Sequence, residues 1–114
     1  MTETIYKIVI SQSAIRDITN IRRYILEHFK YTQLGNNFLR KIRNAIQSIE
    51  VFPLGNRQTD FSYRDYDIFL KTSKSYLIFY VVDKEKHIVI LWRVLQDSMN
   101  WNAIISSWLI ETNN

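Results

Sequence analysis

The chain has 114 residues, of which 46% are hydrophobic and 23% charged, with no cysteine and a formal net charge of +4 at pH 7. This length and composition predict one globular domain, residues 1–114, and exclude a disordered segment or a membrane span, because no apolar run approaches about 20 residues. The lack of cysteine excludes disulfides, thiolate metal sites and a cysteine nucleophile, and with no recognisable signal peptide we expect a cytoplasmic protein.

The positive charge is concentrated in the first half of the chain. Residues 1–60 hold nine Lys and Arg against five Asp and Glu, whereas residues 61–114 hold six of each. A basic surface of this kind suits an acidic partner, either nucleic acid or an acidic protein segment. The alternative is that these side chains form only the solvated faces of helices, and the net charge is too small to indicate a dedicated nucleic-acid-binding protein.

The first half predicts a short strand followed by a helical hairpin. The strand is Tyr6–Ile10, and Ser11 follows it as the N-cap of the first helix. Apolar residues then recur at helical spacing, and after a short break a second amphipathic helix begins at Thr32 and ends before Pro53. Two long helices joined by so short a link are expected to form an antiparallel hairpin.

The second half predicts a three-stranded antiparallel meander. Residues 54–65 are polar without periodicity and are expected to form a loop, after which residues 66–71 alternate as a strand and residues 72–75 form a tight turn. The central strands, Tyr76–Val82 and His87–Leu95, are apolar almost throughout, which is typical of strands buried on both faces.

A short amphipathic helix is predicted after the sheet. Its apolar residues, at the spacing of one helix face, are Trp101, Ile104, Ile105, Trp108 and Leu109. We expect this stripe to pack on the open face of the chain's own sheet; the alternative is that it is offered to another chain. The first strand cannot pair with its sequence neighbour and should join the meander across the hairpin. Together these elements predict an α+β fold with the hairpin covering one sheet face.

Three stretches of the chain are similar to a known family. They are Tyr6–Ile18, Ile49–Gly55, and Tyr76–Tyr80 followed by Ile88–Leu95 and Trp101. In order and spacing they resemble the RelE/ParE superfamily of bacterial toxins, the toxin half of type II toxin–antitoxin pairs, over most of residues 6–101. The resemblance implies a small twisted antiparallel sheet covered on one face by an N-terminal helical hairpin, with a short C-terminal helix.

The superfamily contains two kinds of activity, mRNA cleavage on the ribosome and poisoning of DNA gyrase. RNA-cleaving members often carry Arg-Val-Leu-His-Gly-Arg-Arg-Asp at the end of the last strand, where this chain has Arg-Val-Leu-Gln-Asp-Ser-Met-Asn at residues 93–100. Gln96 cannot shuttle a proton near neutral pH, and Ser98 and Met99 cannot neutralise a phosphate. The apolar run Tyr76–Tyr80 is also more similar to the gyrase-directed, ParE-like branch.

The resemblance therefore implies a toxin that arrests growth by inhibiting DNA gyrase, acts in plasmid stabilisation and is neutralised by a cognate antitoxin. The antitoxin is expected to bring an acidic, disordered tail that wraps the helical hairpin, and the toxin would contact operator DNA only through it. One alternative is a RelE-like endoribonuclease that cleaves mRNA on the ribosome. Another is a degenerate member that only binds its antitoxin and co-regulates transcription. We expect no cofactor, no metal and no membrane partner, because no residues stand at metal-ligand spacing and no span is present.

The candidate functional residues are mainly cations. Those expected to contact the target or the antitoxin are Arg22, Arg23, Arg40, Arg57, Arg64, Arg93, Trp101 and Trp108. The catalytic candidates of the endoribonuclease alternative are Arg64, Arg93, Glu50 and Asp97. Arg93 has a second interpretation, because a charge near the end of an apolar strand is also explained by pairing with a carboxylate or a helix end.

Overall fold

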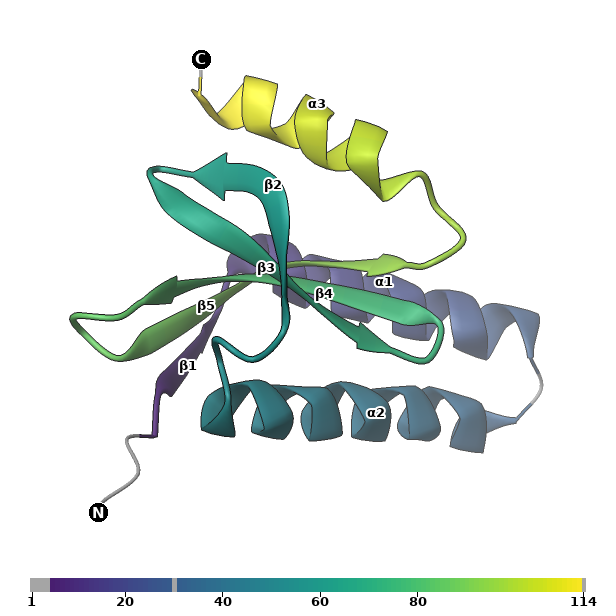
Figure 1. The fold of residues 1–114 in the computed structure, drawn as a ribbon. Helices are drawn as coiled ribbons and strands as arrows, with labels where there is room; N and C mark the ends of the chain where they lie inside the picture. The colour runs from purple at the N-terminus through teal and green to yellow at the C-terminus, as the bar shows by residue number, and fades with distance from the viewer. Residues whose placement is uncertain (1–4, 30, 114) are drawn as a thin grey trace.

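The computed structural model describes residues 5–29 and 31–113, and the side chains of these residues as far as residue 110. Its elements (Figure 1) are β1 (Lys7–Ile10), α1 (Gln12–His28), α2 (Thr32–Val51), β2 (Arg57–Tyr63), β3 (Tyr66–Ser73), β4 (Tyr76–Asp83), β5 (Ile88–Gln96) and α3 (Trp101–Asn113). This order confirms the predicted α+β class. Among the described residues, no helix combines the length and the apolar character that a membrane span needs.

The five strands form one mixed sheet in the order β1-β5-β4-β3-β2. β2 to β5 pair as antiparallel neighbours, whereas β1 pairs with β5 in parallel, from Lys7 opposite Ile88 to Ile10 opposite Leu91. The expected pairing of the first strand with the meander across the hairpin is therefore confirmed. Parallel neighbours need a long connection, which the two helices and the meander supply. The sheet is therefore mixed, and not wholly antiparallel as the resemblance implied.

The prediction of a loop over residues 54–65 is wrong, because Arg57–Tyr63 forms the edge strand β2. β2 is antiparallel to β3 and carries one irregularity of register. Thr59 stabilises this irregularity, since its buried hydroxyl donates a hydrogen bond to the carbonyl oxygen of Ile68 at 2.7 Å. Half of this edge strand is polar and exposed, so its apolar alternation is too sparse to be recognised in the sequence.

The helical hairpin covers one face of the sheet (Figure 1). In this layer Phe38 and Ile49 of α2 belong to one buried cluster with Ile78 and Tyr80 of β4. Tyr80 is fully buried, and its hydroxyl donates a hydrogen bond to the carbonyl oxygen of Pro53 at 2.6 Å, just after the end of α2. The tyrosine thereby ties the central strand to the connection that leads from the hairpin into β2.

α3 covers the opposite face of the sheet (Figure 1). Ile105 and Leu109 are buried in a second cluster with Leu77 and Phe79 of β4, and the other residues of the apolar stripe pack against it. The prediction that this helix packs on the chain's own sheet is confirmed. Because both faces are covered, β4 is buried along almost its whole length, as its apolar sequence predicts.

Candidate functional site

The free edge of β5 changes partner halfway along the strand. β1 pairs with it as far as Leu91, and beyond this point α1 lies along the edge. Ser11 caps α1, as predicted, and its hydroxyl donates a hydrogen bond to the carbonyl oxygen of Trp92 at 2.8 Å. The carboxylate of Asp17 then accepts a hydrogen bond from the amide of Val94 at 2.9 Å. Side chains of α1 therefore satisfy main-chain groups that no strand reaches.

Arg93 is held by Asp17 in a bidentate ion pair. Its Nε donates to one carboxylate oxygen at 2.8 Å and its Nη2 to the other at 2.9 Å. The two side chains are only 20% and 13% exposed. The interpretation that Arg93 pairs with a carboxylate is confirmed, and its charge is neutralised within the fold. The sequence offers only a partial signal for this partner, which is that Asp17 stands beside the apolar face of the predicted first helix.

The guanidinium of Arg93 also lies over an indole ring of α3. Its central carbon is 3.3 Å from the centroid of the Trp108 ring, and Trp108 in turn makes an edge-to-face contact with Trp92 at 6.1 Å between centroids. Stacking of a desolvated guanidinium on an indole is favourable. Arg93 therefore joins three elements, α1, β5 and α3, at one point.

A cavity of about 360 Å³ lies beside this ion pair, between α1, the end of β5 and α3. Besides the ion pair, its lining includes Ile21 and Tyr24 from α1 and Gln96 and Met99 from the end of the sheet. At position 96, where RNA-cleaving members of the superfamily often carry histidine, the side-chain amide of Gln96 lines this cavity. At position 99, where they often carry arginine, the thioether of Met99 lines it. Neither Gln96 nor Met99 can transfer a proton near neutral pH, so these two positions supply no general acid or base.

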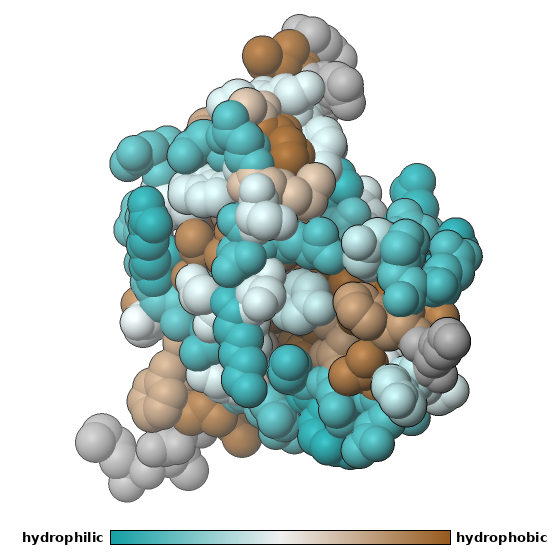
Figure 2. Space-filling model, turned by 90° about the vertical axis from the view of Figure 1, so that its right-hand side faces the viewer, coloured by the Kyte–Doolittle hydropathy of each residue, from teal (hydrophilic) through white to brown (hydrophobic). Residues whose placement is uncertain are grey.

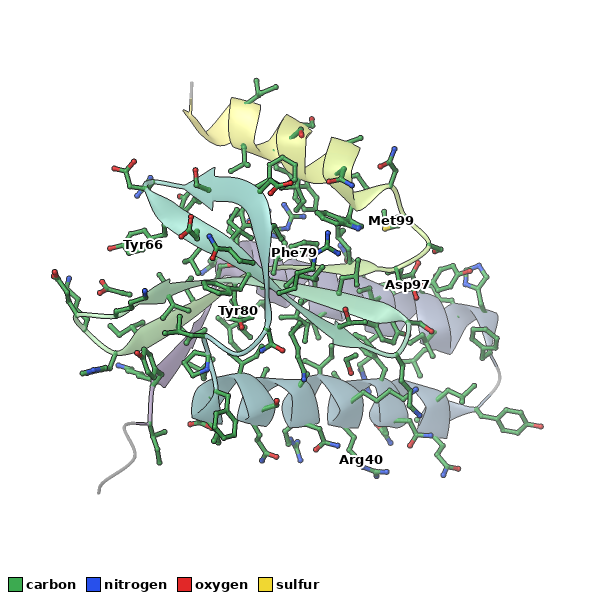
Figure 3. All side chains as sticks on the ribbon, in the orientation of Figure 1. Arg40, Tyr66, Phe79, Tyr80, Asp97 and Met99 are labelled. Carbon is green, nitrogen blue, oxygen red and sulfur yellow. The ribbon has the colours of Figure 1, made fainter. Side chains whose placement is uncertain are left out.

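The four candidate catalytic residues do not come together. Arg64 lies in the turn that precedes β3, whereas the amide of Asp97 donates to the carbonyl oxygen of Ser75 in the turn that follows β3 (2.8 Å). The eight residues of β3 separate these turns by roughly 23 Å, and Figure 3 shows Tyr66, close to Arg64, at the end of the sheet opposite Asp97. Glu50 lies in the last turn of α2, on the hairpin side of the sheet.

Two further candidate arginines lie on β2 and its turn. The guanidinium carbon of Arg57 is 5.5 Å from the centroid of the Trp101 ring, and that of Arg64 is 5.2 Å from the Tyr63 ring. Both arginines are exposed, while Trp101 is half-buried against Phe79. Together with the stack of Arg93 on Trp108, this places a guanidinium on each of the two tryptophans that were predicted to bind a partner.

The candidate arginines of the helices differ in exposure. Arg23 and Arg40 are exposed, and Figure 3 shows Arg40 pointing away from the sheet. Arg22 is half-buried, and within the described residues its Nε is buried without a hydrogen-bond partner. It lies where the helices approach closely, because a Cβ added to Gly35 would stand 3.6 Å from its Cγ and 3.0 Å from Leu26.

Three tyrosines have perturbed ionisation. Burial raises the pKa of Tyr80. Burial is also the main cause that raises the pKa of Tyr76, and the negative charge of Asp97 adds to it. The negative charge of Asp83 is the main cause that raises the pKa of Tyr66. All three phenols therefore stay protonated at neutral pH. They can donate hydrogen bonds, but as neutral phenols they are weak general bases.

The fold is shared with known toxin–antitoxin complexes. The structure matches the RelBE2 complex of Mycobacterium tuberculosis with a TM-score of 0.57 and 17% identity, covering 82% of this chain and 99% of that one. It matches the ParDE system of Pseudomonas aeruginosa with a TM-score of 0.65 and 7% identity, covering 81% and 96%. It matches the RelE–RelB complex of Pyrococcus horikoshii with a TM-score of 0.56 and 10% identity, covering 82% and 97%.

At these identities the structural likeness shows the fold, and the family follows from the sequence itself. No curated protein matches the chain. The family model described as the ParE toxin of the type II toxin–antitoxin system parDE matches residues 8–101, which include the hairpin and all five strands except the first residue of β1. The chain therefore belongs to the ParE toxin family of type II toxin–antitoxin systems.

Proposed function

We propose that this toxin arrests bacterial growth in the cytoplasm by inhibiting DNA gyrase, and that a cognate antitoxin neutralises it. The observation that carries the proposal is the cavity beside the Asp17–Arg93 ion pair. Where an RNA-cleaving relative would present a histidine and cations, this cavity presents Gln96 and Met99.

Cleavage of RNA by its own 2′-hydroxyl needs a general base, an acid for the departing 5′-oxygen and cations around one phosphate. All of these groups must lie within hydrogen-bond reach of one bond. Here Arg64 and Asp97 stand at opposite ends of β3, and Asp17 occupies the fork of Arg93 that would otherwise bind a phosphate. The arrangement favours inhibition by binding over RNA chemistry.

The antitoxin partner is supported by the same comparisons that support the family. The similar structures from Mycobacterium tuberculosis and Pyrococcus horikoshii are complexes of a toxin with its antitoxin. For this chain, Arg22, Arg23 and Arg40 remain the predicted contacts on the helical hairpin. Arg57, Arg64, Trp101 and Trp108 remain those on β2, the turn that follows it and α3.

Controlled expression of the chain in a bacterial host tests the proposal. We expect growth arrest with induction of a DNA-damage reporter and with full-length cellular mRNAs in primer extension. Codon-positioned mRNA cleavage without the damage signal would instead support the endoribonuclease alternative. Normal growth in several hosts, with folded protein present, would support the degenerate alternative.

A further inference from the structure

The two outer strands of the sheet have free edges of different character. β2 carries charged and polar side chains and an irregularity of register, and both features hinder the pairing of an edge with another chain. β1 has the sequence Lys-Ile-Val-Ile, and it pairs with β5 in a regular register from Lys7 to Ile10. β1 is therefore the edge at which a further strand can extend the sheet.

The main-chain groups on the outer side of β1 belong to Ile8 and Ile10. The amides of Lys7 and Ser11 donate hydrogen bonds to main-chain oxygens of β5 and of the residue before it, at 2.9 and 3.0 Å. Main-chain groups point alternately to the two sides of a strand, so those of Ile8 and Ile10 point away from β5. Within the described part of the chain, no other strand pairs with them. A second extended strand can satisfy these groups.

Exposed apolar side chains surround this edge. The C-terminal end of α2 lies beside β1 (Figure 1). The exposed apolar residues of β1, of the position before it and of this helix end are Ile5, Val9, Ile10, Val51, Phe52 and Leu54. We call these six residues the β1 edge patch. The surface of α2 at the bottom of the view in Figure 2 is mainly hydrophilic by contrast. Large apolar side chains that gather at the surface of a monomer mark a surface for a partner.

The area of the β1 edge patch is sufficient for a weak dimer. Its six residues are on average about half exposed, which gives about 500 Å² per copy if each fully exposed residue contributes roughly 150–200 Å². Two copies would bury about 1,000 Å² from these residues, which is near the lower limit of specific interfaces. We therefore expect a dissociation constant in the micromolar range.

The charge of the edge suits a second copy of the chain. Lys7 is the one charged residue of β1, and the last turn of α2 contains Glu50 and no basic residue. The β1 edge patch itself contains no charged residue. A strongly acidic or strongly basic segment would gain little from such a surface, whereas two copies of it would not repel each other.

We propose that two copies of the chain pair through β1, in antiparallel direction about a twofold axis, with Val9 opposite Val9 of the second copy. Ile8 of each copy then pairs with Ile10 of the other, and each such pair can exchange two main-chain hydrogen bonds. Lys7 lies opposite Ser11 of the second copy, and the two Lys7 residues are roughly 13 Å apart along the strands.

This arrangement closes as a dimer. The hairpins of both copies cover the same face of the joined sheet, so the ends of the two α2 helices approach each other near the axis. Both β2 edges remain on the outside, and their polar residues and irregular register prevent further growth. The proposal concerns the association of the chain with itself and depends on neither the target nor the antitoxin.

Sedimentation velocity of the purified chain tests the self-association. Between about 1 and 200 µM, we expect the average mass to rise from that of the monomer toward that of a dimer. Phe52→Glu should raise the dissociation constant at least about tenfold, because it puts a charge near the axis in both copies. The matched control is Tyr31→Glu, since Tyr31 is an aromatic residue at the other end of α2 and is 73% exposed, against 66% for Phe52. This control should remain within about twofold of wild type. Thermal unfolding verifies that both variants fold.

A single introduced cysteine tests the strand pairing itself. The chain has no cysteine, so any disulfide of the variant Val9→Cys joins two copies. Opposite residues of a pair without main-chain hydrogen bonds have Cα atoms about 4.5 Å apart, which a disulfide can bridge. Under mild oxidation we expect most of this variant to migrate as a dimer on a non-reducing gel. Gln58→Cys, at an exposed position of β2, is the control and should remain mostly monomeric.

Three results would overturn the proposal. The first is a chain that stays monomeric up to about 200 µM. The second is a dimer that Phe52→Glu leaves unchanged, or one in which positions 9 and 58 form disulfides equally well, because such a dimer uses another surface. The third is a monomeric chain in which Phe52→Glu weakens binding of the protein encoded by the adjacent reading frame, since the edge would then serve that partner.

Discussion

Asp17 accepts three hydrogen bonds, two from the guanidinium of Arg93 and one from the amide of Val94. The sequence identifies Arg93 as a charge that needs a partner, because it interrupts the most apolar strand. It does not identify the partner, which stands 76 positions earlier in the chain on another element. Pairing of this kind depends on how α1 lies against β5, and no local pattern encodes that arrangement.

Removal of Arg93 tests whether its role is structural. Arg93→Ala leaves the mostly buried carboxylate of Asp17 without its cation, so we expect the free energy of unfolding to fall by about 3 kcal/mol. Urea unfolding measures the change. Arg40→Ala, which removes an exposed arginine, is the control and should change stability by less than about 0.5 kcal/mol. An Arg93→Ala protein that is as stable as wild type but no longer toxic would place Arg93 at a contact with the target.

Burial of Tyr80 makes the free energy of unfolding depend on pH in the alkaline range. Burial raises its pKa above the ordinary value of 10.0. Below pH 10 the phenol is protonated in both the folded and the unfolded chain, and the full stability is present. As the pH rises beyond 10, this tyrosine ionises in the unfolded chain at a lower pH than in the folded chain. The free energy of unfolding therefore falls until the pH has passed the pKa of Tyr80 in the folded chain.

Tyr80→Phe should flatten this alkaline loss of stability. At neutral pH the same variant should lose about 1–2 kcal/mol, because the carbonyl oxygen of Pro53 and the amide of Asn56 lose their hydrogen-bond partner. Chemical unfolding at a series of pH values measures both effects. The role assigned to Tyr80 is wrong if the variant and the wild type lose stability in parallel above pH 10.

Among the elements, the helices were predicted from apolar periodicity and the central strands from continuous apolar runs, whereas β2 was not predicted. α1, α2 and α3 each carry an apolar stripe, and β4 is apolar throughout, so local pattern and tertiary role agree. β2 is an edge strand whose exposed positions are polar, and its pairing is supported by Thr59, which the sequence alone marks as a loop residue. The parallel direction of β1 is also not encoded in the residues of β1. It follows from the long connection between β1 and β5, which contains both hairpin helices and three strands.

The packing of α3 on the sheet is tested by two isoleucines in one helix. Ile105 is fully buried against the sheet, whereas Ile110 is 64% exposed. Ile105→Ala should lower the free energy of unfolding by about 2–4 kcal/mol, because it leaves a cavity between α3 and β4. Ile110→Ala should change it by less than about 0.5 kcal/mol. Equal effects of the two substitutions would mean that α3 does not pack as described.

At the scale of the whole molecule, the sheet separates surfaces of different character. The hairpin face carries exposed arginines, a groove at the tip of the hairpin is mostly apolar with Lys41 in its lining, and the far end of the sheet is acidic. The sequence predicted the basic excess of the first half. It could not predict this groove, because Phe29, Leu34 and Tyr76 become neighbours only when the hairpin packs on β4.

The supercoiling reaction of purified DNA gyrase tests the central claim most directly. Relaxed plasmid, ATP and gyrase are incubated with increasing concentrations of the purified chain, with heat-denatured chain as the control. We predict that the folded chain inhibits supercoiling in a concentration-dependent way and that purified ribosomes programmed with mRNA show no cleavage at the same concentrations. Unimpaired supercoiling together with codon-positioned cleavage of the mRNA would contradict the account.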